Sequence, residues 1–248
     1  MIVTTEAVVL KSRKYGDSSK IVSLFSKDEG KISIIAKGAR QTKNKFGSSL
    51  NPLSYCSVQY YKKPQQELHT LSKAELIKPW NRLTESYEHL SCGLAILESL
   101  SLTIHENENN EELFAALINI FSMLNETENN PFAYFTSFQL QLASLLGFNI
   151  DFNTKNLQSN ITANKKIYFS LESGLHISEQ DRIQKKFFIF DIETYKILEE
   201  ISMNNFESIK NIPLNEKAKR QIIDFFISYF SFHLDKKFYF RAFNLMKV

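Results

Sequence analysis

The chain has 248 residues, of which 43% are hydrophobic, and its 30 lysines and arginines nearly balance 27 aspartates and glutamates. This is the composition of a globular protein with a sizeable core, and it excludes a membrane span, which needs a run of about 18 apolar residues. The charge is divided unevenly, because residues 1–82 carry a net charge of +9 and the remaining residues a net charge of −6. We therefore expect a basic module that binds a polyanion and an acidic module with another task.

The first 80 residues are expected to form a small β-barrel. Five short runs rich in β-branched and aromatic residues lie at 5–13, 19–26, 31–37, 53–61 and 67–76. Turn signals such as Tyr15-Gly16-Asp17-Ser18 separate them, because glycine accepts a positive φ and aspartate can bond its own backbone. An open sheet of such strands would leave hydrophobic edges, which favours a closed barrel. An OB-fold would place a short helix or a loop in the polar gap at 38–51.

After Pro79 the apolar residues recur at helical spacing. A long amphipathic helix is predicted from Trp80 to Ile104. Two further helices are predicted at 110–124 and 131–147, each opened by an asparagine at the cap position.

The segment from Phe148 to Phe190 interrupts the helical pattern and contains one predicted β-hairpin at 167–178. Asp191 is then expected to cap a helix to Met203, and the last helix begins near Asn215. The predicted fold class is therefore α+β. A five-stranded OB-fold barrel at 1–79, basic and DNA-binding, is followed by an acidic, mainly α-helical domain at 80–248, which has one small β-hairpin and an insert at about 148–190.

Basic residues gather in the loop after the third predicted strand. Lys37, Arg40, Lys43 and Lys45 lie there within nine residues. Their ammonium and guanidinium groups can neutralise phosphates, while Gly38 and Gly47 let the backbone approach a strand closely. These four cations are the first candidates for contact with DNA.

A second set combines further cations with aromatic side chains that could stack on bases. Its main members are Arg13, Lys14, Lys62 and Lys63, with Lys11 and Lys20 beside the same turn, Tyr15 and Phe46 as the aromatic members, and Tyr60 and Tyr61 nearby. Plain solvation explains a basic loop equally well, and one of the adjacent Tyr60 and Tyr61 must point into the barrel on any strand. Both explanations stay open from the residues alone.

No motif in the sequence indicates catalysis. Cys56 and Cys92 lack partners at metal-ligand spacing, and neither a nucleophile motif nor a Walker or dinucleotide loop occurs. The acidic run Glu106, Glu108, Glu111 and Glu112 is explained by a loop and a first helical turn. We therefore expect a non-enzymatic protein with no metal and no cofactor. The first residues lack the features of a signal peptide, which predicts a cytoplasmic location.

One stretch of the barrel carries a recognisable family pattern. Residues 8–53 contain Leu10, Arg13, Tyr15-Gly16-Asp17, Leu24-Phe25-Ser26, Glu29-Gly30-Lys31 and Ala36-Lys37-Gly38-Ala39-Arg40. In order and spacing this stretch resembles the bacterial RecO family of recombination and repair mediators. The resemblance continues more loosely into Leu146-Gly147-Phe148 and into the C-terminal residues 233–246.

The resemblance implies an OB-fold, a helical domain and no catalysis. It further implies binding of single- and double-stranded DNA, annealing of complementary strands in a RecF-type pathway, and cooperation with RecR and, indirectly, RecA on strands covered by single-stranded DNA-binding protein. The acidic, apolar-ended tail of that protein would need a hydrophobic pocket rimmed by cations, for which the candidates are Lys165, Lys166, Lys185 and Lys186. Some members of the family hold zinc with four cysteines after the Leu-Gly-Phe segment. Because residues 151–164 contain no cysteine, no zinc is expected and packing alone should hold the hairpin.

The sequence therefore predicts a monomeric recombination mediator that binds DNA. A protein-interaction adaptor, whose basic barrel binds an acidic protein instead of DNA, is the alternative, because any polyanion would satisfy the charge asymmetry. A third alternative is an enzyme such as a nuclease, which would need carboxylates clustered in a cleft.

Overall fold

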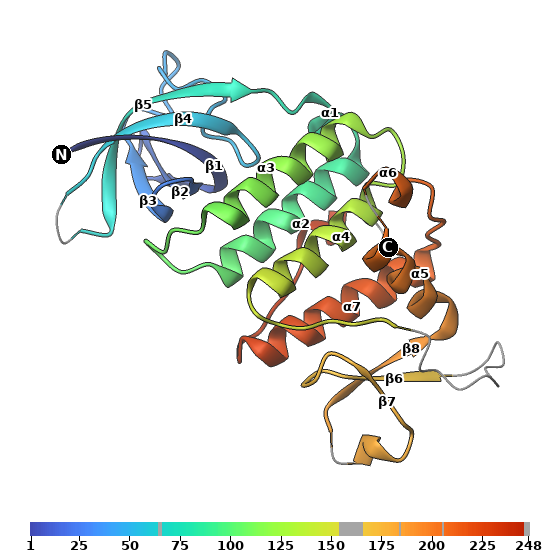
Figure 1. The fold of residues 1–248 in the computed structure, drawn as a ribbon. Helices are drawn as coiled ribbons and strands as arrows, with labels where there is room; N and C mark the ends of the chain where they lie inside the picture. Colours follow the sequence, from blue (N-terminus) through green and yellow to red (C-terminus); the bar gives the residue numbers. More distant parts are fainter. Residues whose placement is uncertain (64–65, 154–165, 184, 205, 246–248) are drawn as a thin grey trace. The chain divides into compact units, whose positions relative to one another are not determined.

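The computed structural model describes residues 1–63, 66–153, 166–183, 185–204 and 206–245 (Figure 1). The chain divides into two compact units. We call residues 1–86 with 97–125 the barrel unit, and residues 87–96 with 126–248 the helical unit.

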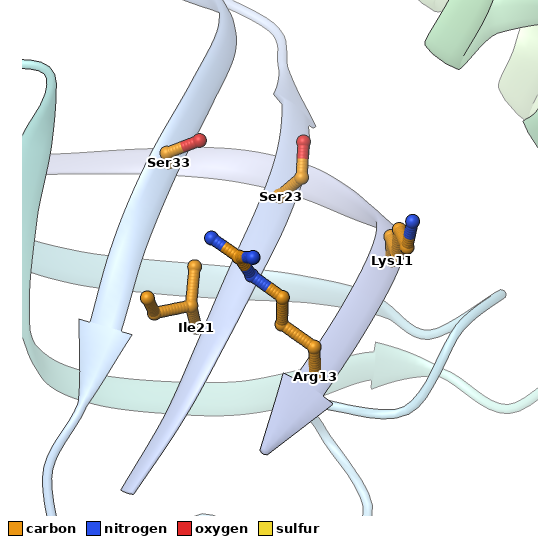
Figure 2. A pocket seen from close by; sticks show the side chains of 5 residues that line it. All are labelled: Lys11, Arg13, Ile21, Ser23 and Ser33. Atoms are coloured by element: carbon orange, nitrogen blue, oxygen red, sulfur yellow. The ribbon is translucent and has the colours of Figure 1, made fainter. Parts of the chain in front are cut away.

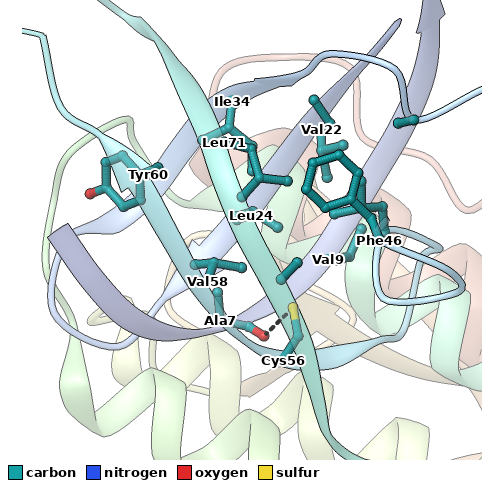
Figure 3. Packing of buried hydrophobic residues seen from close by; sticks show 14 of the residues in the cluster. Ala7, Val9, Val22, Leu24, Ile34, Phe46, Cys56, Val58, Tyr60 and Leu71 are labelled. Carbon is teal, nitrogen blue, oxygen red and sulfur yellow. Dashed lines mark hydrogen bonds between the residues drawn. The ribbon is translucent and has the colours of Figure 1, made fainter. Parts of the chain in front are cut away.

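Five strands close into a barrel, as the sequence predicts. They are β1 (Ile2–Tyr15), β2 (Ser19–Ser26), β3 (Gly30–Ala36), β4 (Tyr55–Tyr61) and β5 (Leu68–Lys78), in the order β1-β2-β3-β5-β4. All neighbours pair antiparallel except β3 with β5, which pair in parallel. This barrel is an OB-fold. Alternate side chains point inward and fill the barrel with buried apolar groups, including Val9, Val22 and Leu24 (Figure 3).

The helices after the barrel differ from the prediction in one respect. A single helix was expected from Trp80 to Ile104, but α1 (Asn81–Glu85) and α2 (Tyr87–Thr103) are separated at Ser86, whose backbone is extended. Serine favours such a position before a helix, because its hydroxyl can accept bonds from the first helical N–H groups. The hydrophobic period continues through the break, so the period alone does not reveal it.

Helix α3 (Glu111–Glu126) completes the barrel unit. The ring of Phe114 packs edge-on against Phe25 of β2, with 5.6 Å between ring centroids. Trp80 stacks on Tyr55 of β4 at 6.2 Å and meets Phe121 of α3 at 6.1 Å. The outer side of β2 near Phe25 is therefore covered by a helix, which explains why Phe25 is fully buried.

The helical unit combines four further helices with a small sheet. The helices are α4 (Pro131–Leu145), α5 (Ile192–Met203), α6 (Phe206–Ile209) and α7 (Glu216–His233), and short 3₁₀ helices lie at Asp181–Ile183 and Ala242–Leu245. The predicted hairpin is present as β6 (Lys166–Ser170) and β7 (His176–Ile177). A third strand, β8 (Phe187–Asp191), pairs with β6 and was not predicted. Its short apolar run lacks the alternation by which a strand is recognised.

Phenylalanine rings form the core of the helical unit. Phe225, Phe226 and Phe230 of α7 are all fully buried and belong to this core. Not every predicted cap forms, because Asn130 makes no cap bond before α4 and its side-chain amide instead donates to the Ile209 and Ile212 carbonyls. The caps of α5 and α7 are present. The Asp191 carboxylate accepts a bond of 2.7 Å from the Thr194 N–H, and the Asn215 side chain accepts one of 2.8 Å from the Ala218 N–H. In the described part of the chain, no helix is both long and apolar enough to cross a membrane.

Candidate nucleic-acid interface

The outer face of β1, β2 and β3 carries two rows of neighbouring side chains. Lys11 lies opposite Ser23, which lies opposite Ser33. Arg13 lies opposite Ile21, which lies opposite Ile35. Directly opposed residues on one face of a sheet lie close enough to act on one ligand.

A β-bulge puts the two cations on this face. The pairing of β1 with β2 shifts register between Val9 and Lys11, so that Leu10 is an extra residue. Val9 and Leu10 are both buried, and beyond them Lys11 and Arg13 are exposed. A bulge re-aims the side chains that follow it, which is how β1 changes from a core strand to a ligand-facing strand.

These rows enclose a shallow pocket of about 210 Å³ lined by Lys11, Arg13, Ile21, Ser23 and Ser33 (Figure 2). Figure 2 shows the guanidinium group of Arg13 reaching from β1 over β2. The two serines offer small polar side chains, Ile21 offers an apolar surface, and the cations supply positive charge. This combination suits a nucleotide, whose phosphate needs cations and whose sugar and base need a polar and apolar surface. The pocket also lies on the face with which OB-folds bind oligonucleotides.

The basic loop is tied to the turn between β1 and β2. Arg40 donates from its backbone N–H to the Ser18 carbonyl at 2.9 Å, and from Nη1 to the Gly16 carbonyl at 2.8 Å. Lys37, Arg40, Lys43 and Lys45 are all exposed. The structure thus brings this loop next to the turn that follows Arg13, Lys14 and Tyr15. The ring of Tyr15 is 52% exposed and available for stacking.

Phe46 was predicted to stack on bases, but its side chain is buried in the barrel. Its ring is 3% exposed and belongs to the barrel core (Figure 3). The Lys45 ammonium lies 5.1 Å from the ring centroid. A ring enclosed in this way has no free face for a base, so Phe46 is better explained as a core residue. Of the adjacent tyrosines, Tyr60 is fully buried and stacks on His69, whereas Tyr61 is 48% exposed.

Lys62 and Lys63 are not gathered with the other cations. Lys62 forms a close ion pair with Glu29, which lies in the turn between β2 and β3. That turn is at the opposite end of β2 from Ser18 and Arg40, about 20 Å away for a strand of this length. Lys63 is exposed beside Lys62.

The lysines suggested for a partner's tail are separated in the helical unit. Lys166 begins β6 and lies opposite Asp191, whereas Lys185 and Lys186 precede Phe187, which lies opposite Ser170 at the other end of β6. Lys166 and Lys185 are exposed, and the Lys186 ammonium lies 5.3 Å from the Phe232 ring centroid. Lys165 is outside the described residues.

The two cysteine thiols are buried, and the carboxylate of Glu106 is paired with a lysine. Burial raises the pKa of the Cys56 thiol to about 12, and burial also raises the pKa of Cys92. Glu106 lies 3.5 Å from the Lys31 ammonium, which also donates to the Ser101 carbonyl. Within the described ranges, no three metal-ligating side chains lie close enough to hold an ion.

Sequence reasoning named Lys11 only among the cations that flank the first turn, and it did not select Ile21, Ser23 and Ser33 as site residues. The signal was available in part, because alternation along 19–26 places Ile21 and Ser23 on one side of a strand. What the sequence lacks is the pairing that sets these residues beside Ser33 and the two cations.

Comparison with known proteins connects both units to one family. The family model for the N-terminal part of recombination protein O matches residues 1–80, and the model for its C-terminal part matches residues 84–240. The DNA repair protein RecO of Chloroherpeton thalassium is 30% identical over 243 residues, which cover 95% of this chain and 94% of that protein. The DNA repair protein RecO of Salinibacter ruber is 38% identical over 146 residues, which cover 59% of this chain and 56% of that protein. The protein of the same name from a Thermoanaerobacter species is 26% identical over 245 residues, covering 96% and 94%.

Proposed function

Because the chain belongs to the recombination protein O (RecO) family, we propose that it is a DNA repair protein that holds DNA on the outer face of β1, β2 and β3. The observation that carries this proposal is the pocket formed by the two cross-strand rows, with the basic loop fixed at the adjacent turn. Phosphates would lie along Lys11, Arg13 and the cations of the loop. Bases would pack on Ile21 and Tyr15.

The proposed activity is that of a non-enzymatic recombination mediator. The protein would bind single- and double-stranded DNA, anneal complementary strands, and help RecA to load on strands covered by single-stranded DNA-binding protein. Family membership and the strongly basic barrel sequence support this proposal. RecR and the acidic tail of single-stranded DNA-binding protein are the proposed partners, and Lys166, Lys185 and Lys186 remain the proposed contacts for that tail.

The test is the salt dependence of binding to a fluorescent single strand, measured by anisotropy. Each cation that contacts a phosphate adds about 0.7 to the slope of log affinity against log salt. The variant Lys11→Ala/Arg13→Ala should therefore bind more weakly and lower that slope by about 1.4. The control Lys27→Ala/Lys73→Ala removes the same charge from exposed positions outside the pocket and should retain the wild-type slope.

Two results would contradict the proposal. Equal losses in the two variants would mean that DNA responds only to overall charge and not to the pocket. If the wild-type protein ignores DNA at low salt but binds an acidic protein, the adaptor function replaces the mediator.

A further inference from the structure

The residues after α7 present alternating buried and exposed side chains. Phe238, Phe240 and Phe243 are buried, and their rings lie 4.9–5.6 Å from those of Phe230, Phe135 and Phe132, respectively. Lys236, Lys237 and Arg241 are exposed, and Tyr239 is half-buried. We call residues 236–241 the C-terminal ribbon. Aromatic packing from below fixes the ribbon, so its outward side chains are held in place against the helical unit.

The charge of the ribbon is not compensated. The helical unit holds 15 acidic and 15 basic residues. In it, Lys217 pairs with Asp191 at 2.8 Å and Lys219 pairs with Glu88 at 2.9 Å. Across the described residues, no salt bridge joins Lys236, Lys237 or Arg241 to an acidic side chain. Asp235 precedes the ribbon and lowers the local charge, which still remains positive. The ribbon is therefore a basic surface on a unit that is otherwise acidic.

The ribbon also offers a stacking surface. The Arg241 guanidinium carbon lies 4.5 Å from the centroid of the Tyr239 ring. A guanidinium group this close to a tyrosine ring is attracted electrostatically by the face of the ring. Bases stack on aromatic and guanidinium planes, while neighbouring lysines neutralise phosphates. An acidic peptide would also use the cations, but a nucleic acid presents a flat base beside every phosphate, so a ring set among cations favours a nucleic acid.

We propose that the C-terminal ribbon is a second binding surface for single-stranded DNA, so that one chain holds two strands at once. The inference rests on the proposed function, because the first strand would occupy the face of β1, β2 and β3. A protein that holds two strands on separate surfaces raises the concentration of each near the other. The ribbon thereby gives the helical unit a direct part in annealing.

The experiment counts the strands bound by each full-length chain. The probes are two oligothymidylates of about ten nucleotides, within the site size of one OB-fold, which carry a donor and an acceptor dye. Native mass spectrometry of the complexes reports the number of chains and strands, and energy transfer reports two strands on one chain. The wild-type protein should bind two strands and show transfer.

Three variants locate the second strand. Lys236→Ala/Lys237→Ala/Arg241→Ala should keep one strand and lose energy transfer, and because these side chains are exposed its circular dichroism melt should match the wild type. The control Lys196→Ala/Lys210→Ala/Arg220→Ala removes equal charge from exposed positions of the same unit and should keep both strands. Arg241→Lys keeps the charge but loses the flat guanidinium group, so it should weaken binding of the second strand selectively.

The possible failures are distinguishable. If the wild-type chain binds one strand only, or if the ribbon variant still binds two, the ribbon proposal is wrong while the barrel interface stands. Equal loss of the second strand in the control variant would also overturn it, since bulk charge would then explain binding. Displacement of the second strand by polyglutamate at a lower concentration than unlabelled oligothymidylate requires would identify the ribbon as a peptide site instead. If the wild-type chain binds no DNA, the proposed function itself fails.

Discussion

Phe46 separates two explanations of the basic loop, one in which it stacks on DNA and one in which it anchors the loop to the barrel. Because its ring is 3% exposed within the barrel core, Phe46→Ala should leave a cavity and reduce the free energy of unfolding by about 3–5 kcal/mol. Tyr15 is the matched control. Its ring is 52% exposed, so Tyr15→Ala should change stability by less than about 0.5 kcal/mol, but it should weaken DNA binding by about 1–3 kcal/mol.

Trp80 makes the assay specific to the barrel unit. It is the only tryptophan of the chain, it is buried, and it stacks on Tyr55 of β4. Urea unfolding followed by its fluorescence therefore reports the barrel unit. Oligonucleotide anisotropy in the absence of urea reports binding. The reasoning would be refuted if Phe46→Ala unfolded at the wild-type urea concentration while losing DNA affinity, since that is the behaviour of an exposed stacking residue.

Three further perturbations test particular contacts. Gly16→Ala should cost about 1–2 kcal/mol from its positive φ alone, whereas Gly30→Ala should cost more, because a Cβ there would collide with the Glu108 carbonyl oxygen; equal urea midpoints for the two variants would contradict the close approach. Burial lowers the pKa of His69, so the unfolded chain binds this proton more readily and the stability of the barrel unit should fall as the pH drops below about 6.5. His69→Gln should flatten that dependence in urea titrations, and an unchanged slope would assign it to another group. Asp191→Ala removes the side-chain cap of α5 and should cost about 1 kcal/mol in thermal unfolding, and a variant as stable as the wild type would show that the cap contributes nothing.

The barrel was predictable because its information is local. Strands β3 and β4 alternate more and less buried residues over seven positions, and turns such as Tyr15-Gly16-Asp17-Ser18 divide the strands. The break at Ser86 was missed for the opposite reason, since the hydrophobic period of the helices continues across it. Strand β8 was missed because a short apolar run satisfies a strand and a buried helix equally well.

The basic loop shows where composition misleads. From the sequence, Phe46 is the aromatic residue of a cationic segment and therefore a candidate for stacking on bases. In the structure the loop's cations are exposed while this ring is buried, because a loop over the end of a barrel needs an apolar anchor. Charge therefore identified the loop, but burial decides which of its side chains can meet a ligand.

The pocket depends on register, and register is not local information. Side chains of a strand alternate with a period of two, so a shift of one residue would exchange the faces of Lys11 and Arg13 with that of Ser12. Residues 7–10 are all buried, so their burial does not reveal the bulge, which is shown by the register shift that makes Leu10 an extra residue. The cations reach the face of Ser23 and Ser33 only because of that extra residue. A ligand surface built across three strands therefore follows from pairing, which the residues of each strand restrict but do not determine.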